Sequence, residues 1–259
     1  MTNQWRTKAR SIANSKKAVT ISLLSSVSLL LGLASPPALA ATDPVPDPEP
    51  TVSTFDKTKY SLDDPKSIWV VVDKQRPLNP KKFVPKLVRP SFAHPKTYNP
   101  FSLWLAPQAA KAIVTLAQAA KDAGAGQLIM QSAYRSFDYQ VSIHARDVKR
   151  YGLKAGEALA ARPGYSEHQT GLAIDIAAYG QGCTIRVCFA KTRMGRFVAK
   201  YGWEYGFIVR YPDGETPTTG YQFEPWHLRF VGLELAKEMH NQGVTVLENF
   251  FELPAAPNY

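Results

Sequence analysis

The spacing of hydrophobic residues changes along the chain and predicts a mixture of helices and strands after residue 65. A β-branched run over residues 67–74, SIWVVVDK, is typical of a strand. The prolines of the next segment, residues 76–90, predict an irregular course that wraps around the domain. Pro107 then suits the first position of a helix, because apolar residues follow it at helical spacing as far as Ala120.

The rest of the pattern adds further elements and contains no internal repeat. Strands are typical of the runs QLIMQSAYRS, LAIDIA, GFIVRYP and WHLRFVG. Helices are expected from a cap at Ser136 to about Tyr151, and over residues 155–161, 192–201 and 233–241. Since the helices cluster early and the strands late, we expect an α+β fold with an antiparallel central sheet flanked by helices.

The first forty residues have the layout of an export signal. Five basic residues precede an apolar stretch over residues 19–34, and Ala38-Leu39-Ala40 then matches an A-x-A cleavage site. We expect cleavage after Ala40 and a secreted, extracytoplasmic protein associated with a bacterial cell wall. An uncleaved N-terminal anchor is the alternative. Residues 41–64 are rich in proline and predict a linker, and residues 65–259 form the predicted domain.

The charge balance and the cysteines narrow the class of protein. The net charge is +10 for the whole chain, and it becomes +5 without the five basic residues of the signal. No basic run has interleaved aromatic residues, so nucleic acid is a poor candidate ligand. Cys183 and Cys188 are the only cysteines, and an even count at close spacing in an exported protein predicts a disulfide between them. The same spacing alone is a weak zinc pattern.

Asp175 lies between two isoleucines of a predicted strand, where a carboxylate needs a partner. Burying it alone is costly, so a hydrogen bond, a counter-charge or a metal must compensate. His168 precedes Asp175 by seven residues, and His227 follows three residues after Glu224. Two imidazoles and one carboxylate suit a catalytic zinc with an open fourth position, and Glu224 is placed to take a proton from water there. A structural hydrogen bond between histidine and Asp175 is the simpler alternative.

Three segments, SAYRSFDYQ, SEHQTGLAIDI and EPWHLRFVG, occur in this order and resemble the signature blocks of zinc D-alanyl-D-alanine carboxypeptidases of the VanY type. The run VVVDKQRPLNPKKFVPKLV resembles the approach to that domain, so the likeness covers residues 65–240. The resemblance implies the hedgehog/D-Ala-D-Ala peptidase-like fold and a Zn²⁺ cofactor. It also implies peptidoglycan stem peptides ending in D-Ala-D-Ala as the substrate. We expect a monomer without an obligate protein partner.

Carried over position by position, the resemblance implies roles for seven residues. The implied zinc ligands are His168, Asp175 and His227. Glu224 would act as general base toward a metal-activated water and then as acid toward the leaving D-alanine. Arg135 would stabilise the substrate and the developing oxyanion. Gln140 and Ser166 would help to hold the substrate.

Several residues near these positions have structural explanations instead. Gln140 on a helix surface and Ser166 in a turn are the alternatives for two of them. Glu167 is expected to be solvated or to support the site from outside, and Trp226 to pack beneath it. Arg210 is expected in a structural ion pair with an unidentified acid. No metal role is expected for the other histidines, His94, His144 and His240.

The leading hypothesis is a secreted zinc carboxypeptidase that removes the terminal D-Ala from peptidoglycan stem peptides. A D-Ala-D-Ala dipeptidase or a peptidoglycan endopeptidase of the same fold would use the same chemistry. A module that binds wall peptides without cleaving them is the alternative from another class. The intact Glu224 argues against such a module, and the export signal favours a wall substrate over a free dipeptide.

Overall fold

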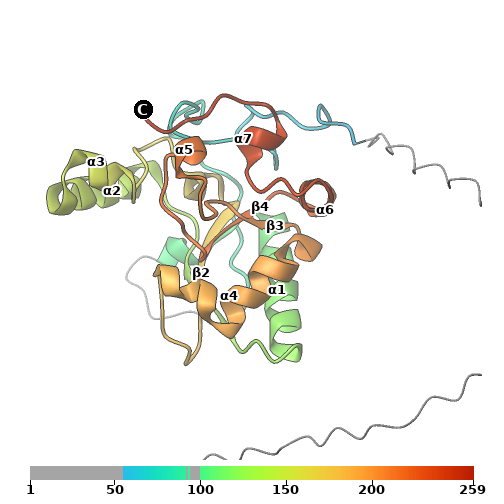
Figure 1. Ribbon diagram of the computed structural model, residues 1–259. Helices are drawn as coiled ribbons and strands as arrows, with labels where there is room; N and C mark the ends of the chain where they lie inside the picture. The colour runs from blue at the N-terminus through green and yellow to red at the C-terminus, as the bar shows by residue number, and fades with distance from the viewer. Residues whose placement is uncertain (1–54, 92, 94–99) are drawn as a thin grey trace, which may run out of the picture. The chain divides into compact units, whose positions relative to one another are not determined.

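The computed structural model describes residues 55–91, 93 and 100–259, and Figure 1 shows their arrangement. The predicted signal, most of the predicted linker and His94 lie outside these residues. The strands are β1 (Leu128–Ser132), β2 (Ala173–Ala178), β3 (Phe207–Val209) and β4 (His227–Phe230). The helices are α1 (Pro107–Asp122), α2 (Phe137–Tyr151), α3 (Leu153–Glu157), α4 (Arg193–Tyr201), α5 (Thr216–Thr219), α6 (Leu233–Asn241) and α7 (Leu247–Phe250). In the described part of the chain, no helix is both long and apolar enough to cross a membrane.

The four strands form one antiparallel sheet in the order β1-β2-β4-β3, which confirms the predicted α+β class. Alternation along β4 separates two environments. Leu228 and Phe230 join the main core, where the buried stripes of α1 and α4 pack against the sheet. The side chains of His227 and Arg229 project from the opposite face, because successive side chains of a strand point to opposite sides. The sheet therefore has a hydrophobic face and a face that carries polar groups.

Two helices begin where the sequence indicates. Pro107 is the first residue of α1, and the buried residues of α1 follow at helical spacing. Ser136 caps α2, since its hydroxyl oxygen accepts a hydrogen bond from the Tyr139 amide at 3.1 Å. Within α2 only Gln140 is buried, and Figure 1 shows α2 and α3 projecting from the body of the domain. This pair of helices forms a wall with little core of its own.

The strand predicted over residues 67–74 is wrong, although its residues are buried. Trp69 and Val71 join a core with α6 and α7, while Val70 and Val72 join the main core, so the segment is wedged between two apolar clusters. Its carbonyls do not pair with a strand. Two of them, at Ile68 and Val70, accept hydrogen bonds from the Arg229 guanidinium at 3.1 and 2.7 Å. The segment is rich in β-branched residues because it is buried on both sides, and not because it pairs with a neighbouring strand.

Some predicted bounds also need correction. The helix expected over residues 155–161 lies earlier, at Leu153–Glu157, because Gly152 with φ of 81° lets a new helix start directly after α2. The strand expected over residues 127–136 ends at Ser132, since a β-bulge after Met130 disrupts its pairing with β2. The strand expected over residues 206–212 covers only Phe207–Val209.

The predicted disulfide is confirmed. Cys183 and Cys188 are bonded, with their Cα atoms 5.5 Å apart. The bond closes a short surface loop in which Ile185 and Val187 are exposed, at 42% and 54%. The loop therefore holds two apolar side chains at the surface.

Gly171 forms the left-handed turn just before β2, and replacing it should destabilise the fold. Its φ is +70°, and a Cβ there would lie 2.9 Å from the Leu87 side chain and 3.0 Å from the Ala106 amide nitrogen. Gly180 has a similar φ of +67° but open space around it. We expect Gly180→Ala to cost about 1 kcal/mol through its backbone conformation, and Gly171→Ala to cost roughly 1–3 kcal/mol more through overpacking. Urea denaturation measures both, and equal costs would contradict this explanation.

Candidate metal centre

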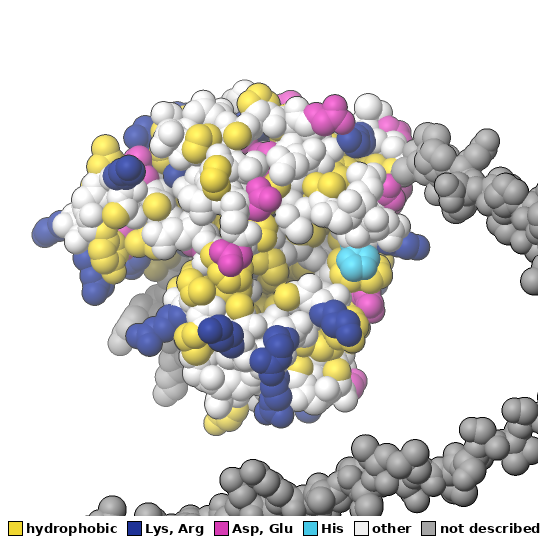
Figure 2. Space-filling model, in the orientation of Figure 1, with side chains coloured by type: hydrophobic (Ala, Val, Ile, Leu, Met, Phe, Trp, Pro, Cys, Tyr) yellow, Lys and Arg dark blue, Asp and Glu magenta, His cyan; other side chains and the backbone are white. Residues whose placement is uncertain are grey.

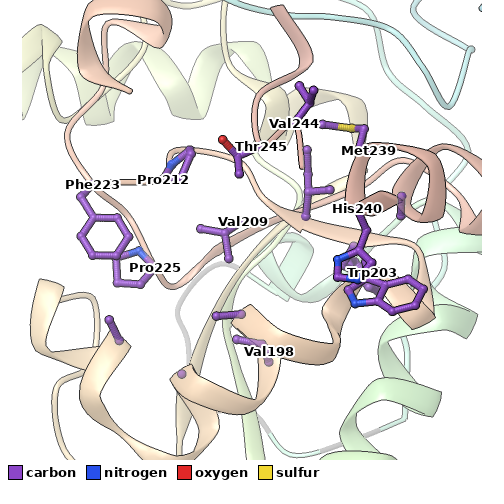
Figure 3. Close-up of a pocket in the computed structure, with 16 residues that line it drawn as sticks. Val198, Trp203, Val209, Pro212, Phe223, Pro225, Met239, His240, Val244 and Thr245 are labelled. Atoms are coloured by element: carbon purple, nitrogen blue, oxygen red, sulfur yellow. The ribbon is translucent and has the colours of Figure 1, made fainter. Parts of the chain in front are cut away.

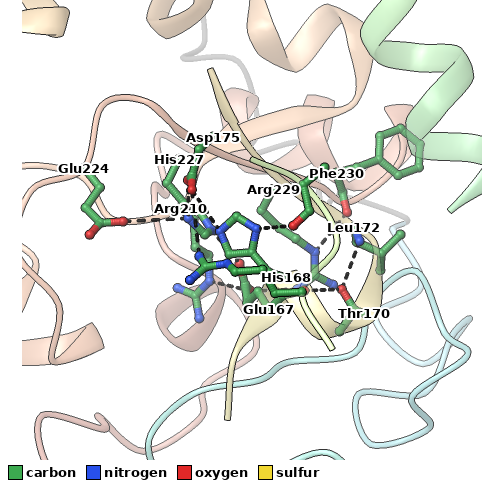
Figure 4. Close-up of polar contacts among 12 residues, drawn as sticks. Glu167, His168, Thr170, Leu172, Asp175, Arg210, Glu224, His227, Arg229 and Phe230 are labelled. Carbon is green, nitrogen blue, oxygen red and sulfur yellow. Dashed lines mark hydrogen bonds and ion pairs between the residues drawn. The ribbon is translucent and has the colours of Figure 1, made fainter. Parts of the chain in front are cut away.

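Three buried side chains meet on the polar face of the sheet: His168, Asp175 and His227. One ligand atom from each lies within 4.8 Å of the other two (Figure 4). The Nε2 atom of His168 is 3.3 Å from Asp175 Oδ2, and the Nδ1 atom of His227 is 3.2 Å from Asp175 Oδ1. The structure thus brings together the three residues predicted as ligands.

Strand register places two of these ligands side by side. Asp175 on β2 lies directly opposite His227 on β4 in the antiparallel ladder. Opposite residues of such a pair point to the same face, with their Cβ atoms about 4.5–5.5 Å apart. His168 comes from the short 3-10 helix η2 (Glu167–Thr170), which leads into β2 through the left-handed turn at Gly171. A shift of one residue in this register would move His227 to the hydrophobic face.

The two histidines present different ring nitrogens to the centre. His168 has its Nδ1 atom 2.6 Å from the Ala133 carbonyl oxygen, which leaves Nε2 facing Asp175. His227 has its Nε2 atom 3.3 Å from Glu167 Oε2, which leaves Nδ1 facing Asp175. Each ring is therefore oriented by an outer acceptor, as is usual for histidine ligands of metals.

The arrangement fits a tetrahedral zinc ion. Ligand bonds of about 2.0–2.1 Å at tetrahedral angles place ligand atoms roughly 3.3 Å apart. The two histidine nitrogens lie 3.3 and 3.2 Å from one or the other carboxylate oxygen of Asp175, which is close to that spacing. Two atoms of the set, His168 Nε2 and Asp175 Oδ1, are buried without a hydrogen-bond partner. Buried polar atoms are normally satisfied, so a cation between them would remove an unfavourable feature of the site.

Burial and neighbouring charges set the protonation of the ligands in the metal-free protein. Burial lowers the pKa of His168 to about 4, and the nearby Arg135 charge acts in the same direction. Burial opposes protonation of His227 as well, but the neighbouring carboxylates of Asp175 and Glu167 outweigh it and raise the pKa of His227 to about 9. At neutral pH His168 is therefore neutral, while His227 carries a proton.

Glu224 lies beside the ligands without joining them. Its Oε2 atom is 3.7 Å from His227 Nδ1, and its side chain is buried. Burial raises the pKa of Glu224 to about 8, against the opposing effect of His227. A carboxylate whose pKa is near neutrality can both accept and return a proton, which is what a general base and acid requires.

The residues predicted to bind substrate lie around the same point. Arg135 approaches Asp175 Oδ2 to 3.8 Å, and Ser166 lines a cavity beside the ligands. Gln140 is buried behind Arg135, so it does not lie on a helix surface. Its side-chain oxygen accepts a hydrogen bond from Arg135 at 3.2 Å, and its nitrogen donates to the Ala161 carbonyl at 2.8 Å. Gln140 thus orients Arg135, and its direct contact with substrate stays a prediction.

Two hollows meet at Glu224 and Arg135. The first, the inner cavity, has a volume of about 20 Å³ and is lined by Ser166, Tyr211 and Tyr221 among others. The second, the outer groove, has a volume of about 580 Å³ and runs between α2 and the loop that carries Ile185. The space on one side of the metal centre is therefore small, and the space on the other side is large.

A buried charge network supports the ligands from below. Glu167 Oε1 accepts hydrogen bonds from Arg210 at 2.9 Å and from Arg229 at 2.7 Å, and Glu248 binds Arg210 at 2.9 and 2.6 Å. Burial alone would raise the pKa of Glu167, but the charges of Arg229 and Arg210 hold it well below its ordinary value. Glu167 is thus a fixed anion that accepts the outer proton of His227.

Sequence reasoning did not assign this role to Glu167. The residue is fully buried, so the expectation that it is solvated is wrong, while the expectation that it supports the site is confirmed. The unidentified partners of Arg210 are Glu167 and Glu248. The position of Glu167 next to the candidate ligand His168 was the one sign of its role in the sequence. Nothing in the sequence spacing indicated that Arg210 and Arg229 are its partners.

The two other histidines that the structure describes, His144 and His240, have their own contacts. His144 Nε2 lies 3.2 Å from Glu157, which links α2 to α3. His240 stacks on Trp203 with ring centres 4.0 Å apart, at the edge of an apolar cavity of about 270 Å³ (Figure 3). Figure 2 shows hydrophobic side chains gathered in a hollow on this face. That cavity contains none of the three ligands.

Comparison with known proteins connects this geometry to a family. A family model described as VanY, D-alanyl-D-alanine carboxypeptidase, matches residues 102–233. The Bacillus subtilis protein named "Putative carboxypeptidase YodJ" is 37% identical over 74% of this chain and 70% of its own length. A D-alanyl-D-alanine carboxypeptidase of Enterococcus faecium is 32% identical over 58% of this chain, which spans 45% of that relative. The chain belongs to the VanY family.

Solved structures agree with this assignment. The LdcB LD-carboxypeptidase has a TM-score of 0.68 and 37% identity, covering 73% of this chain and 87% of its own. VanYB in complex with D-alanine-D-alanine has a TM-score of 0.59 and 30% identity, covering 71% and 96%. A variant of the VanY D,D-pentapeptidase, solved with Zn(II), has a TM-score of 0.58 and 30% identity, covering 70% and 97%. This VanY-family protein is a zinc metallo-carboxypeptidase.

Zinc binding should release protons from this site. His227 is protonated below about pH 9 in the metal-free protein, and its Nδ1 atom must lose that proton to bind a metal. We therefore expect about one proton or more to be released per zinc at pH 7, and apparent affinity to rise between pH 7 and 9. Titration calorimetry in buffers of different ionisation enthalpy measures the release. His168→Ala should abolish stoichiometric binding and His240→Ala should not. Proton-independent binding would contradict this account.

Glu167→Gln should destabilise the fold strongly. The substitution leaves Arg229 and part of the Arg210 pairing without a counter-charge in the interior, and breaking a buried ion pair costs about 3–5 kcal/mol. Glu234 pairs with Lys59 at the surface, so Glu234→Gln should change stability by less than about 1 kcal/mol. Chemical denaturation of the metal-free variants compares the two. Similar small effects for both would show that the network does not stabilise the fold.

Proposed function

We propose that this VanY-family protein removes the terminal D-Ala from peptidoglycan stem peptides outside the cytoplasm. The observation that carries the proposal is the unequal space on the two sides of Glu224 and Arg135. The inner cavity, about 20 Å³, has room for about one water molecule or a methyl group. The outer groove, about 580 Å³, has room for a chain. Such a site favours release of one small residue from the end of a longer peptide.

The side chains around the centre supply the groups that this reaction needs. His168, Asp175 and His227 would hold the zinc ion, which supplies a polarised carbonyl and a water of lowered pKa. Glu224 takes a proton from the attacking water and returns it to the departing amine. Arg135, fixed by Gln140, faces the developing negative charge with a cation that needs little reorganisation. Tyr211 and Tyr221 line the inner cavity and limit its size.

The comparisons support the substrate in part. VanYB was solved with D-alanine-D-alanine, and the family model names D-alanyl-D-alanine carboxypeptidase activity. LdcB, an LD-carboxypeptidase, has both a higher identity and a higher TM-score than VanYB. Release of D-Ala from a peptide whose preceding residue has the L configuration is therefore the second candidate function. Both candidates use the same zinc centre and the same base.

Other activities fit the site less well. A D-Ala-D-Ala dipeptidase would need little of the outer groove, and an endopeptidase would need room for a chain on both sides, where the inner cavity is small. A module that only binds peptides would not need a buried acid with a raised pKa beside the ligands.

We also propose export, with the signal removed after Ala40. The mass of the mature protein recovered outside the cell tests that step.

Three substrates separate the candidates. We expect the zinc-loaded protein to release D-Ala from a stem pentapeptide ending in D-Ala-D-Ala, with slower release from the tetrapeptide and from free D-Ala-D-Ala. Mass spectrometry follows the products, with and without a chelator. Preference for the tetrapeptide would favour the LD-carboxypeptidase, and cleavage of the dipeptide alone would favour a dipeptidase. If none of the three substrates released D-Ala, the proposal would be overturned.

Glu224→Gln provides the test of mechanism. The variant keeps the size of the side chain but cannot accept the proton, so the rate should fall by about 10²–10⁴-fold. Zinc content, measured by elemental analysis, should stay near that of the unaltered protein because Glu224 is not a ligand. Glu204→Gln, an exposed surface change, is the matched control and should keep full activity. An active Glu224→Gln protein would assign the proton transfer elsewhere.

A further inference from the structure

One face of α2 is not used by the fold or by the reaction described above. Six residues of α2 line the outer groove, and four of them form this face: Tyr139, Ile143, Arg146 and Arg150, with Asp147 and Tyr151 beside them. Their spacing of four, three and four residues places them on a single stripe of the helix. None of the four is buried, so the stripe makes no large contribution to a core.

This stripe begins at the metal centre and leads away from it. Its first residue, Tyr139, lines the same groove as Arg135, Asp175 and Glu224. Ile185, on the loop closed by the disulfide, lines the groove together with the stripe and is 42% exposed. A substrate peptide with its last residue at Glu224 would therefore extend along α2, between this helix and the loop closed by the disulfide.

The two arginines of the stripe differ in whether an acidic side chain already pairs with them. Arg146 is already neutralised by Asp147, through hydrogen bonds of 2.8 and 3.1 Å. Arg150 forms no ion pair with any described residue, and its guanidinium rests 5.2 Å from the ring centre of Tyr151. Arg150 is exposed and lines the groove, so it presents a cation whose counter-ion is missing.

The length of the stripe matches a short peptide. From Tyr139 to Arg150 the helix rises by about 16 Å, at roughly 1.5 Å per residue. An extended chain covers about 3.3 Å per residue, so the same length corresponds to roughly five residues. Because the arginine side chain is long and flexible, it can meet groups borne by a residue three to five positions before the scissile bond.

We propose that the α2 stripe is a binding site for the upstream part of an acidic peptide, with Arg150 receiving a carboxylate three to five residues before the scissile bond. The inference rests on the proposed function and specifies its substrate class: an anionic acyl peptide, with Tyr139 and Ile143 packing along the chain. Since the contact lies far from the reacting bond, it strengthens ground state and transition state alike and acts on KM.

Synthetic substrates test this directly. Acetylated hexapeptides ending in D-Ala-D-Ala carry either Glu or Gln at the third, fourth or fifth position before the scissile bond. At one position we expect the zinc-loaded protein to favour the Glu peptide by about five-fold in kcat/KM, as an exposed ion pair allows. The preference should appear in KM with kcat unchanged, and it should shrink at high salt.

Arg150→Gln should remove the preference while leaving the rate on the Gln peptides within about two-fold, because a neutral side chain loses only the ion pair. Lys149→Gln is the matched control, since it removes the same charge from the adjacent exposed position of α2, which does not line the groove. A preference that survives in Arg150→Gln, or is lost equally in Lys149→Gln, would overturn the inference. Absence of any preference in the unaltered protein would also overturn it, whereas failure to release D-Ala from every peptide would overturn the proposed function itself.

Discussion

The metal centre depends on one buried carboxylate, that of Glu167. A lone carboxylate in the interior is strongly unfavourable, and here two guanidinium groups and an imidazole compensate it. These partners come from β4 and from the residue after β3, and Glu248 of α7 completes the set. The ion pairs therefore fix the end of the sheet, the C-terminal helix and the orientation of a metal ligand in one step.

Strand alternation explains how so few residues combine fold and chemistry. In β4, Leu228 and Phe230 pack into the main core, while His227 and Arg229 face the charged side. Arg229 also satisfies carbonyls of the segment that separates the two cores. Two of the ligands lie on paired strands and the third on the short helix before β2, so the sheet positions the metal site.

The sequence allowed more of the site to be predicted than of its support. The residues around His168, Asp175, Glu224 and His227 allowed a zinc centre, and their resemblance to the VanY signature blocks indicated one. The hydrophobic periods indicated most helices and the antiparallel sheet. The partners of Glu167 lie 43 and 62 residues away, and no local pattern pairs residues at such distances. The run over residues 67–74 failed for a related reason, since alternation records burial on two sides but not hydrogen bonding to a neighbouring strand.

The projecting wall of α2 has a consequence for how this enzyme can diversify. Its helix buries only Gln140 and contacts α3 closely, where a Cβ on Gly156 would lie 2.8 Å from the Val148 backbone. Mutations along the groove side of α2 therefore cost the core little, while the ligands on the sheet tolerate almost none. In the proposed binding mode, catalysis and recognition reside in separable parts of one small domain, so new peptide preferences can evolve on a single helix without change to the zinc site.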